Sequence, residues 1–478
     1  MAKTYTPTIG IECHVQLNTR TKLFSGADND AREAAPNTKV SPICFGLPGT
    51  LPVLNKHAVT LAIRAGLALG SSIQPYSYFE RKHYFYPDLP KGYQITQLAR
   101  PTIGAGVVTI HLDDGTQKPV RVHHAHIEED AGKLTHPTGA DYSLVDLNRA
   151  GTPLIEIVSE PDMHSAAEAK AYAQELYLLM TYAGVTNGDL YYGNMRFDVN
   201  VSVAAEGEPL GTRTETKNLN SFKAVERAVE FEVSRQTKLL EKGERVVQET
   251  RGWNEDKQQT FSQRSKEDAH DYRYFPDADL PPIRLTEDDV EAVRCELPKL
   301  PDEYRRVFYE MKLDASVVSA LLNARTSADL VLAVRENAGV AAATRVAHWL
   351  SSVLRAADSS LDTSRLDVLR LTELSAMTGD NELSSTAAKD VFMELLVSTE
   401  SPRAIAEAKN LLQVSDESAI GAIVDEVLAD PANAKAMADI QAGNERVVGF
   451  LVGQIMKKSS GKANPALAQK LLRERMGL

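Results

Sequence analysis

The stretch Thr152–Asp162, TPLIEIVSEPD, decides how this sequence folds. Its central apolar residues have the β-branched and aliphatic character of a buried strand, yet Glu156 lies in their middle. A carboxylate removed from water must be paired, protonated or bound to a cation. Leu154 and Val158 flank Glu156 on its own face, whereas a solvated face would alternate polar residues. Glu156 therefore indicates a site built on a β-sheet.

Other strand-like runs surround this stretch in the first 280 or so residues. In each run, apolar and polar residues alternate over a short stretch that is bounded by turn residues. The runs cover 8–17, 107–115, 118–130, 143–148 and 197–204. Two helices are also marked: one with a capping box at Ser165 and Glu168 and a stop at Gly184, and one from Ser221 to Gly243. Regular strand–helix alternation is missing, so we predict an α+β fold with a largely antiparallel sheet.

A proline-broken stretch at 277–301 indicates a domain boundary. Beyond it the strand signal nearly disappears, and amphipathic patterns such as 301–312 and 417–430 predict helices. We therefore expect three parts: a sheet-based domain over 1–297, a helical domain over 298–404 and a helical tail domain over 405–478.

The 478 residues have the composition of a globular protein, with 43% hydrophobic and 25% charged residues. No run of about 18 apolar residues predicts a membrane helix, and the N-terminal residues lack a signal-peptide pattern. Three scattered cysteines give neither a disulfide framework nor a CxxC zinc site. We expect a cytoplasmic protein with no membrane partner.

The net charge of −12 argues against a nucleic-acid coat over the whole surface. Charge is nevertheless polarised near the C-terminus. Residues 441–478 carry seven basic residues against two acidic ones, whereas 411–440 carry six acidic residues and one lysine. A charge run is most often a solvated face, but this one also allows a local contact with nucleic acid.

Acidic and imidazole side chains recur within the strand-like runs. Glu12 and His14 lie two residues apart, so a strand points both to one face, where they could share a divalent cation; a polar, solvated face is the alternative. In HHAHIEED, alternation places potential ligands on both faces of the strand. One face has His124, His126, Glu128 and Asp130, and the other has His123 and Glu129. Periodicity does not choose between these sets, and an exposed edge strand explains them equally well. Asp198 repeats the pattern of Glu156, and several strands that each supply one acid form an oxygen-rich Mg²⁺ site.

Cationic side chains that could accompany such a metal are found at Lys82, Lys91, Arg213 and Lys217. The P-loop, the kinase motifs, the GxSxG elbow and the GxGxxG fingerprint are all missing from the sequence. Composition and spacing therefore lead as far as Mg²⁺-dependent phosphoryl chemistry on a sheet.

Seven motifs carry a more specific resemblance, in order from about residue 9 to the end: GIECHVQL, YFYPDLPKGYQITQ, EEDAGKLTH, YSLVDLNRAGTPLIEIVSEPD, ETKNLNSF, KEDAHDYRYFPDADLPP and GFLVGQIMKKSSGKANP. Together they resemble the GatB family, which provides one subunit of the bacterial aspartyl/glutamyl-tRNA(Asn/Gln) amidotransferase. In that family ATP activates the side-chain carboxylate of glutamate or aspartate misacylated on tRNA(Gln) or tRNA(Asn), and ammonia displaces the phosphate. The resemblance implies a glutamine-synthetase-like antiparallel cradle as the catalytic domain. It also implies ATP and Mg²⁺ as cofactors, and it implies four partners: the amidase subunit and the small subunit of the same complex, tRNA and the misacylating aminoacyl-tRNA synthetase.

By motif position the resemblance also implies site residues. The expected metal ligands are Glu12, His14, Glu129, Glu156 and Asp198, and all of these except Asp198 are expected to be catalytic together with Lys91. The expected ATP and phosphate contacts are Lys82, Tyr84, Lys91, Arg213 and Lys217. Lys91 either binds phosphate or gates ammonia, and the expected tRNA contacts are Lys457, Lys458 and Lys462. The sequence departs from the family at Phe197, where a cysteine is usual, and at Cys13, where valine is common.

Two other functions remain compatible with these residues. A stand-alone ATP-dependent carboxylate–amine ligase would share the metal site but would not need a basic tail. A tRNA-binding scaffold without catalysis would use the acids in structural ion pairs, and acids on different strands would then have no reason to converge.

Overall fold

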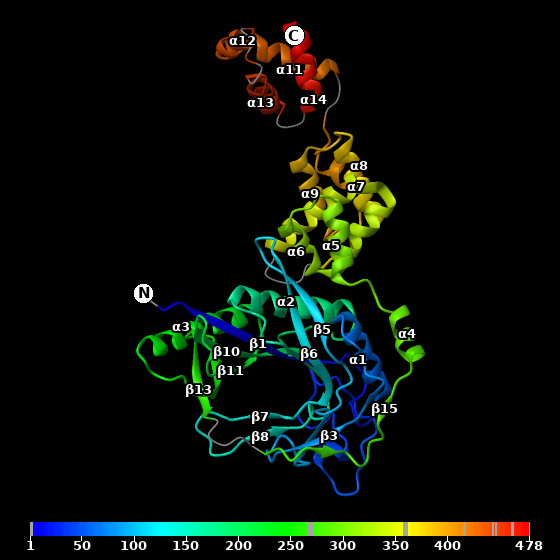
Figure 1. Cartoon of the computed structure of the whole chain (residues 1–478). Coiled ribbons are helices and arrows are strands. Elements are labelled where there is room, and N and C mark those ends of the chain that lie inside the picture. Colours follow the sequence, from blue (N-terminus) through cyan, green and yellow to red (C-terminus); the bar gives the residue numbers. More distant parts are fainter. Residues whose placement is uncertain are drawn as a thin grey trace. The chain divides into compact units, whose positions relative to one another are not determined.

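The computed structural model describes residues 3–265, 271–356, 362–413, 417–441, 444, 447–459 and 463–477. The chain divides into two compact units, Met1–Glu303 and Tyr304–Leu478 (Figure 1). The first unit holds the sheets and the second is helical. The three domain boundaries expected from the sequence, and the glutamine-synthetase-like character of the first domain, stay predictions.

An eight-stranded sheet dominates the first unit. Its strands, from one edge to the other, are β13 (Gln259–Ser265), β12 (Glu249–Asn254), β11 (Thr214–Leu219), β10 (Met195–Ala205), β1 (Tyr5–Gln16), β9 (Pro153–Ser159), β6 (Gln117–Glu129) and β5 (Gly106–His111). Every neighbouring pair is antiparallel except β11 with β12. The predicted α+β fold with a largely antiparallel sheet is therefore confirmed.

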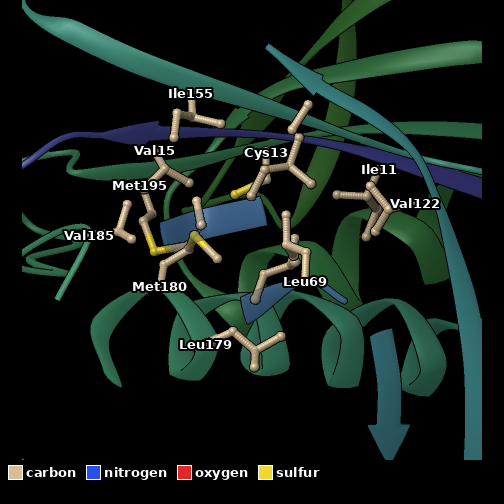
Figure 2. Packing of buried hydrophobic residues seen from close by; sticks show 14 of the residues in the cluster. Ile11, Cys13, Val15, Leu69, Val122, Ile155, Leu179, Met180, Val185 and Met195 are labelled. Atoms are coloured by element: carbon tan, nitrogen blue, oxygen red, sulfur yellow. The ribbon is translucent and has the colours of Figure 1, made fainter. Parts of the chain in front are cut away.

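Strand β1 lies at the centre of this sheet and separates two environments. Its odd-numbered residues Ile9, Ile11, Cys13 and Val15 are fully buried in the main core. Figure 2 shows Ile11, Cys13 and Val15 on the side of the sheet that faces Leu179 and Met180 of helix α2 (Ala166–Tyr182). Because successive side chains on a strand point to opposite faces, the even-numbered residues of β1 line the other face.

Helices α2 and α3 (Phe222–Glu241) were both predicted from the sequence, and both pack on the apolar side of the sheet (Figure 1). Ser165 caps α2 by accepting a hydrogen bond from the Glu168 backbone, and Ser221 caps α3 in the same way. The expected capping box at α2 is incomplete, because the Glu168 carboxylate accepts from the His164 backbone at 2.6 Å rather than from Ser165. The sequence thus predicted both helix starts correctly, though not every cap contact.

Shorter elements surround the large sheet. They form one three-stranded and two two-stranded sheets: β14 (Phe275–Pro276), β3 (Glu80–His83) and β4 (Tyr93–Thr96); β15 (Ile283–Arg284) and β2 (Tyr76–Ser77); β7 (Lys133–Thr135) and β8 (Leu144–Asp146). The remaining helices of this unit are η1 (Pro42–Phe45), α1 (Lys56–Ala68) and α4 (Glu287–Cys295). Cys13 and Phe197 are cross-strand partners with no exposed surface, so both departures from the family pattern fall in the core.

The described part of the second unit is helical. Its elements are α6 (Ala315–Leu322), α7 (Arg325–Ala356), α8 (Val368–Gly379), α9 (Ser385–Leu395), α10 (Pro402–Ala408), α11 (Glu417–Ala429), η2 (Pro431–Asn433), α12 (Ala434–Gln441), α13 (Val448–Lys458) and α14 (Pro465–Met476), and α5 (Pro301–Glu310) leads into it from the first unit. Among the described helices, none by itself is long and apolar enough to cross a membrane. Helices α6 and α7, with a 115° bend between them, reach that length and apolarity only as a pair.

Candidate active site

The polar face of the large sheet gathers side chains from four adjacent strands. On β1, His14 lies opposite Glu156 of β9, and Glu156 in turn lies opposite His126 of β6. On the other side of β1, Glu12 lies opposite Asp198 of β10. Antiparallel pairing places directly opposite residues within contact distance, so the register alone forms a continuous polar row.

The first group of this row consists of His14, Glu128 and Glu156, whose ligand atoms all lie within 4.8 Å of one another. His14 Nε2 is 3.3 Å from Glu156 Oε2 and 3.8 Å from Glu128 Oε1. His126 Nε2 closes the group, at 3.5 Å from Glu128 and 3.6 Å from Glu156. Glu156, the acid in the apolar strand, thus lies beside the imidazoles of His14 and His126.

The electrostatics of this group follow from burial and mutual attraction. Burial alone would lower the pKa of His14, but the charge and hydrogen bond of Glu156, together with Glu128, raise it to about 9. Burial would likewise raise the pKa of Glu156, but His126 and His14 depress it far below its usual range. Without another cation, His14 is therefore protonated at neutral pH to balance the carboxylates.

A second group of oxygen ligands lies beside the first and consists of Glu12, Asp198 and Glu215, again within 4.8 Å of one another. Lys217 Nζ is 3.3 Å from Asp198 Oδ2 and 3.0 Å from Glu215 Oε1. Burial is the main cause that raises the pKa of Glu12, and repulsion from Glu156 and Glu215 adds to it. Lys217 thus bridges two of the three carboxylates, and Glu12 is repelled by the acids around it.

The donor sets of both groups fit divalent cations. Carboxylate oxygens are the ligands that Mg²⁺ and Ca²⁺ prefer, and a carboxylate–imidazole set also suits Mn²⁺. Neighbouring carboxylates raise the pKa of His14 and add to the effect of burial on the pKa of Glu12, and a cation would relieve this crowding of negative charge. Each group could therefore hold one ion through residues that the fold already brings together.

Glu129, predicted as a metal ligand, lies outside both groups. Its side chain forms an ion pair with Lys91 and accepts a hydrogen bond from the Ile95 backbone at 3.0 Å. The structure brings Glu128 to His14 instead, because residues 126 and 128 share a strand face and residue 129 does not. Lys91 and Glu129 border a cavity of about 20 Å³, enough for a single water-sized molecule, which Lys22 also lines.

The predicted phosphate-contacting residues fall in two places. Lys82 and Tyr84 lie near the first group: burial alone would lower the pKa of Lys82, but the charges of Glu128 and Glu156 raise it. Burial and neighbouring carboxylates, Asp88 first, raise the pKa of Tyr84 well above its usual range. Arg213 lines a cleft of about 500 Å³ that Glu12 also borders. Lys217, described above, bridges acids of the second group.

The predicted tRNA contacts lie in the last helices. Lys457 and Lys458 occupy the final turn of α13, and Lys462 lies outside the described residues. Lys458 pairs with Glu426 of α11 at 3.1 Å, and Arg475 of α14 pairs with another α11 acid. The charge polarity seen in the sequence is therefore partly balanced within the tail. The roles of all these residues as ligands or contacts stay predictions.

Three members of the groups were not among the predicted site residues: His126, Glu128 and Glu215. For His126 and Glu128 a signal existed, since alternation put both on one face of their strand, whereas the motif match favoured Glu129. Glu215 lies between Thr214 and Thr216, and these polar neighbours do not indicate that its side chain is buried. Its proximity to Asp198 comes from the pairing of β10 with β11.

Comparisons with known proteins agree with this architecture. Residues 7–291 match the family described as the GatB/GatE catalytic domain, and residues 331–476 match the family described as the GatB domain. A protein of Alcanivorax borkumensis, named as a subunit of aspartyl/glutamyl-tRNA(Asn/Gln) amidotransferase, is 48% identical over 478 residues, covering 98% of both chains. Proteins of the same name from Synechococcus sp. and Persephonella marina are 46% and 44% identical, each covering at least 98% of both chains.

These matches place the large antiparallel sheet and its acidic groups in the class of GatB/GatE catalytic domains. The second unit matches the companion domain of the same class over most of its length. The chain belongs to the GatB family of aspartyl/glutamyl-tRNA(Asn/Gln) amidotransferase subunits, and the resemblance noted in the sequence is confirmed.

Proposed function

We propose that this chain carries out the ATP-dependent amidation step of tRNA-dependent transamidation. The substrate is glutamate on tRNA(Gln), aspartate on tRNA(Asn), or both. The side-chain carboxylate takes the γ-phosphoryl group of ATP, and ammonia then displaces phosphate to give the amide. The observation that carries the proposal is the convergence of two acidic groups from separate strands on one face, with Lys82 and Lys217 beside them.

The two groups would bind separate cations. His14, Glu128 and Glu156 would hold one Mg²⁺ ion, and Glu12, Asp198 and Glu215 would hold a second cation. A bound Mg²⁺ ion offsets the negative charge on phosphate oxygens during transfer. The chain's own contribution is position: each ligand comes from a strand that is hydrogen-bonded on both sides, which fixes the groups before substrate arrives.

The cationic side chains would then bind the phosphates. Lys82 faces the first group, so its ammonium would contact the transferring phosphoryl group. Arg213 and Glu12 border one cleft of about 500 Å³, which has room for the nucleoside of ATP beside the second group. Lys91 forms an ion pair with Glu129 beside a cavity that has room for one water-sized molecule. Because ammonia has this size and phosphate is larger, the cavity favours a role for Lys91 in handling ammonia.

Ammonia needs a source, and the proposal assigns it to a partner. An amidase subunit would release ammonia from glutamine, and a further small subunit would complete the assembly in the cytoplasm. Residues 405–478 would contact the tRNA through exposed basic residues such as Lys457 and Lys458, and the misacylating synthetase would deliver that tRNA. Backbone contacts of this kind add affinity but little sequence discrimination.

The convergence of acids also weighs against a scaffold without catalysis. Structural ion pairs give acids on different strands no reason to converge, whereas Glu12, Asp198 and Glu215 come from three strands and their ligand atoms lie within 4.8 Å of one another. A ligase for a free small molecule would share this chemistry but would have no use for the tail domain.

One experiment separates these functions. The chain is assayed for ATP-dependent formation of Gln-tRNA(Gln) from Glu-tRNA(Gln) with ammonia, with and without its partner subunits. Product with ammonia alone supports the proposal. A folded, tRNA-binding assembly that forms no product from either misacylated tRNA refutes it, and product from free glutamate would identify the small-molecule ligase.

A substitution localises the chemistry to the first group. Glu156→Gln keeps the size of the side chain but removes the charge that holds His14 and His126. We expect Mg²⁺-dependent phosphorylation to fall at least a hundredfold, about 2.7 kcal/mol in activation free energy, while the partner's glutaminase reaction persists. Glu160→Gln, four residues further along and outside both groups, serves as the control. Full activity in Glu156→Gln would show that the acid is not a required ligand.

A further inference from the structure

A polar cleft of about 620 Å³ opens at the end of strand β1 and is separate from the two acidic groups. Gln16, the last residue of β1, lines it and shares a strand face with Glu12 and His14. Two residues along a strand span about 7 Å, so the cleft begins next to the first acidic group. Its lining combines amide side chains, which bind neutral polar groups, with three basic and two acidic side chains: Arg32, Lys133, Arg149, Asp30 and Asp146.

Two aromatic rings stand at the rim of this cleft. Tyr191 is 88% exposed and Tyr192 is 42% exposed, and their ring centroids lie 5.2 Å apart. The turn that carries them is held rigidly: the Asp189 carboxylate accepts from the backbone of both tyrosines, at 3.0 and 3.2 Å. Gly193 takes a positive φ of 69° that closes the turn. An exposed tyrosine on a fixed turn is a platform on which a flat ligand can stack.

The tyrosine turn is connected to the active face through side chains. Asn194, at the end of the turn, donates from Nδ2 to Gln16 Oε1 at 2.9 Å. Gln16 donates to Asp130 Oδ2 at 3.4 Å, and Arg196 donates to the same oxygen at 3.0 Å. Because Arg196 lies opposite His14 in the sheet, the chain of contacts ends at the first acidic group. A ligand seated on the tyrosines would therefore be positioned relative to that group.

The cleft also contains an acceptor that no protein group uses. Asn29 Nδ2 donates to the backbone of Thr19 and Leu17, but its Oδ1 is buried and has no partner among the described residues. A buried acceptor without a partner is costly, and a ligand with an N–H or O–H group would relieve it. Nucleobase amines and ribose hydroxyls are such groups. Lys133 adds an exposed positive charge at the same cleft.

We propose that this cleft holds the unpaired 3′-terminal nucleotides of the aminoacylated RNA, with one base stacked on the Tyr191 ring. This inference rests on the proposed function, since the aminoacyl group is attached to that RNA end and must reach the first acidic group. A cleft of about 620 Å³ accommodates single-stranded nucleotides but excludes a double helix. Stacking supplies affinity without reading the base, and Asn29 Oδ1 would accept a hydrogen bond from the base or sugar.

The test measures binding of a fluorescent acceptor-stem RNA hairpin to the full-length chain. One hairpin carries a single-stranded 3′ end and a matched one is blunt. We expect Tyr191→Ala to weaken binding of the tailed hairpin five- to a hundredfold, the range of one lost base–aromatic stack, and to leave the blunt hairpin unchanged. Tyr191→Phe, which keeps the ring, should bind as the unsubstituted chain does. Tyr142→Ala, at an exposed tyrosine outside the cleft, is the matched control.

Other outcomes would overturn the inference. Equal binding of the tailed hairpin by Tyr191→Ala and by the unsubstituted chain would show that no base stacks there. Unchanged RNA binding together with lost assembly of the partner amidase would identify the tyrosines as a protein contact instead. Failure of the proposed function looks different: the unsubstituted chain would then form no amidated tRNA. Product formation with an unchanged KM in Tyr191→Ala would refute only the cleft assignment.

Discussion

Titration of Mn²⁺ into the metal-free chain at different pH values would test the electrostatics of the first acidic group directly. Glu156 and Glu128 raise the pKa of His14 to about 9, so this imidazole carries a proton at neutral pH. A cation needs the neutral ring as a ligand and must therefore displace that proton. Affinity should accordingly rise with pH until the His14 pKa is reached.

The magnitude follows from the pKa. At about pH 7 the ring lies about two units below its pKa, so roughly one molecule in a hundred is ready to bind. The Kd for Mn²⁺ should therefore fall about tenfold per pH unit and about a hundredfold between pH 7 and 9, equivalent to about 2.7 kcal/mol. Calorimetry in buffers of different ionisation enthalpy should count about one proton released per ion at pH 7.

Two variants complete this test. His14→Gln retains a neutral oxygen or nitrogen ligand but loses the His14 ring, so the pH dependence of its Mn²⁺ affinity should be weaker. The remaining dependence comes from His126, whose pKa Glu156 and Glu128 raise against the effect of burial. Glu215→Gln weakens the second acidic group and should leave the pH dependence of the first group intact. A Kd that stays constant from pH 7 to 9 in the unsubstituted chain, or an unchanged slope in His14→Gln, would refute the reasoning.

Three further predictions concern stability and tRNA binding. Glu232 is fully buried, accepts hydrogen bonds from Thr214, Arg235, Gln236 and Thr260, and pairs with Arg251. Glu232→Leu should therefore lower the free energy of unfolding by about 3–5 kcal/mol in urea titrations, whereas Glu230→Ala on the exposed side should change it by less than about 0.5 kcal/mol. Lys91→Met leaves Glu129 buried without its cation, so thermal unfolding should show a loss of about 3 kcal/mol that Lys91→Met with Glu129→Gln partly restores. Deletion from Ile405 onward should weaken tRNA binding and flatten its salt dependence, and an unchanged affinity across a salt series would remove the electrostatic role of the tail.

The sheet and its polar face were largely predictable because period-two patterning is a local signal. Glu12 and His14 were placed on one face by spacing alone, and the suspicion about Glu156 needed only its apolar neighbours. Their convergence across strands was not predictable from spacing, since it depends on which strands pair and in what register. The recurrence of acids on several strands suggested a shared site, the family resemblance added the reaction, and the register supplied the contacts.

Strand β6 has an irregularity that the alternation of its residues did not predict. Alternation separated His123 from His124, but the strand has a register irregularity between Val122 and His124. The two rings consequently meet, with their Nδ1 atoms 2.6 Å apart. A β-bulge adds one residue to one strand, and nothing in the periodicity of a single strand reveals it. The choice of Glu129 came from motif position, whereas alternation groups Glu128 with His126, and Glu128 is the acid that lies beside His14.

The position of both acidic groups on one strand has a consequence for what this face can recognise. Glu12 and His14 belong to different groups, yet they lie two positions apart on β1, a strand hydrogen-bonded on both sides. Strand rise fixes their backbone separation at about 7 Å, and no loop movement or hinge can alter it. The sheet therefore holds the two groups at a constant separation. A ligand that contacts both groups is selected by the spacing of its own charges. Under the proposed function, this constant backbone spacing would favour a phosphate chain of matching length.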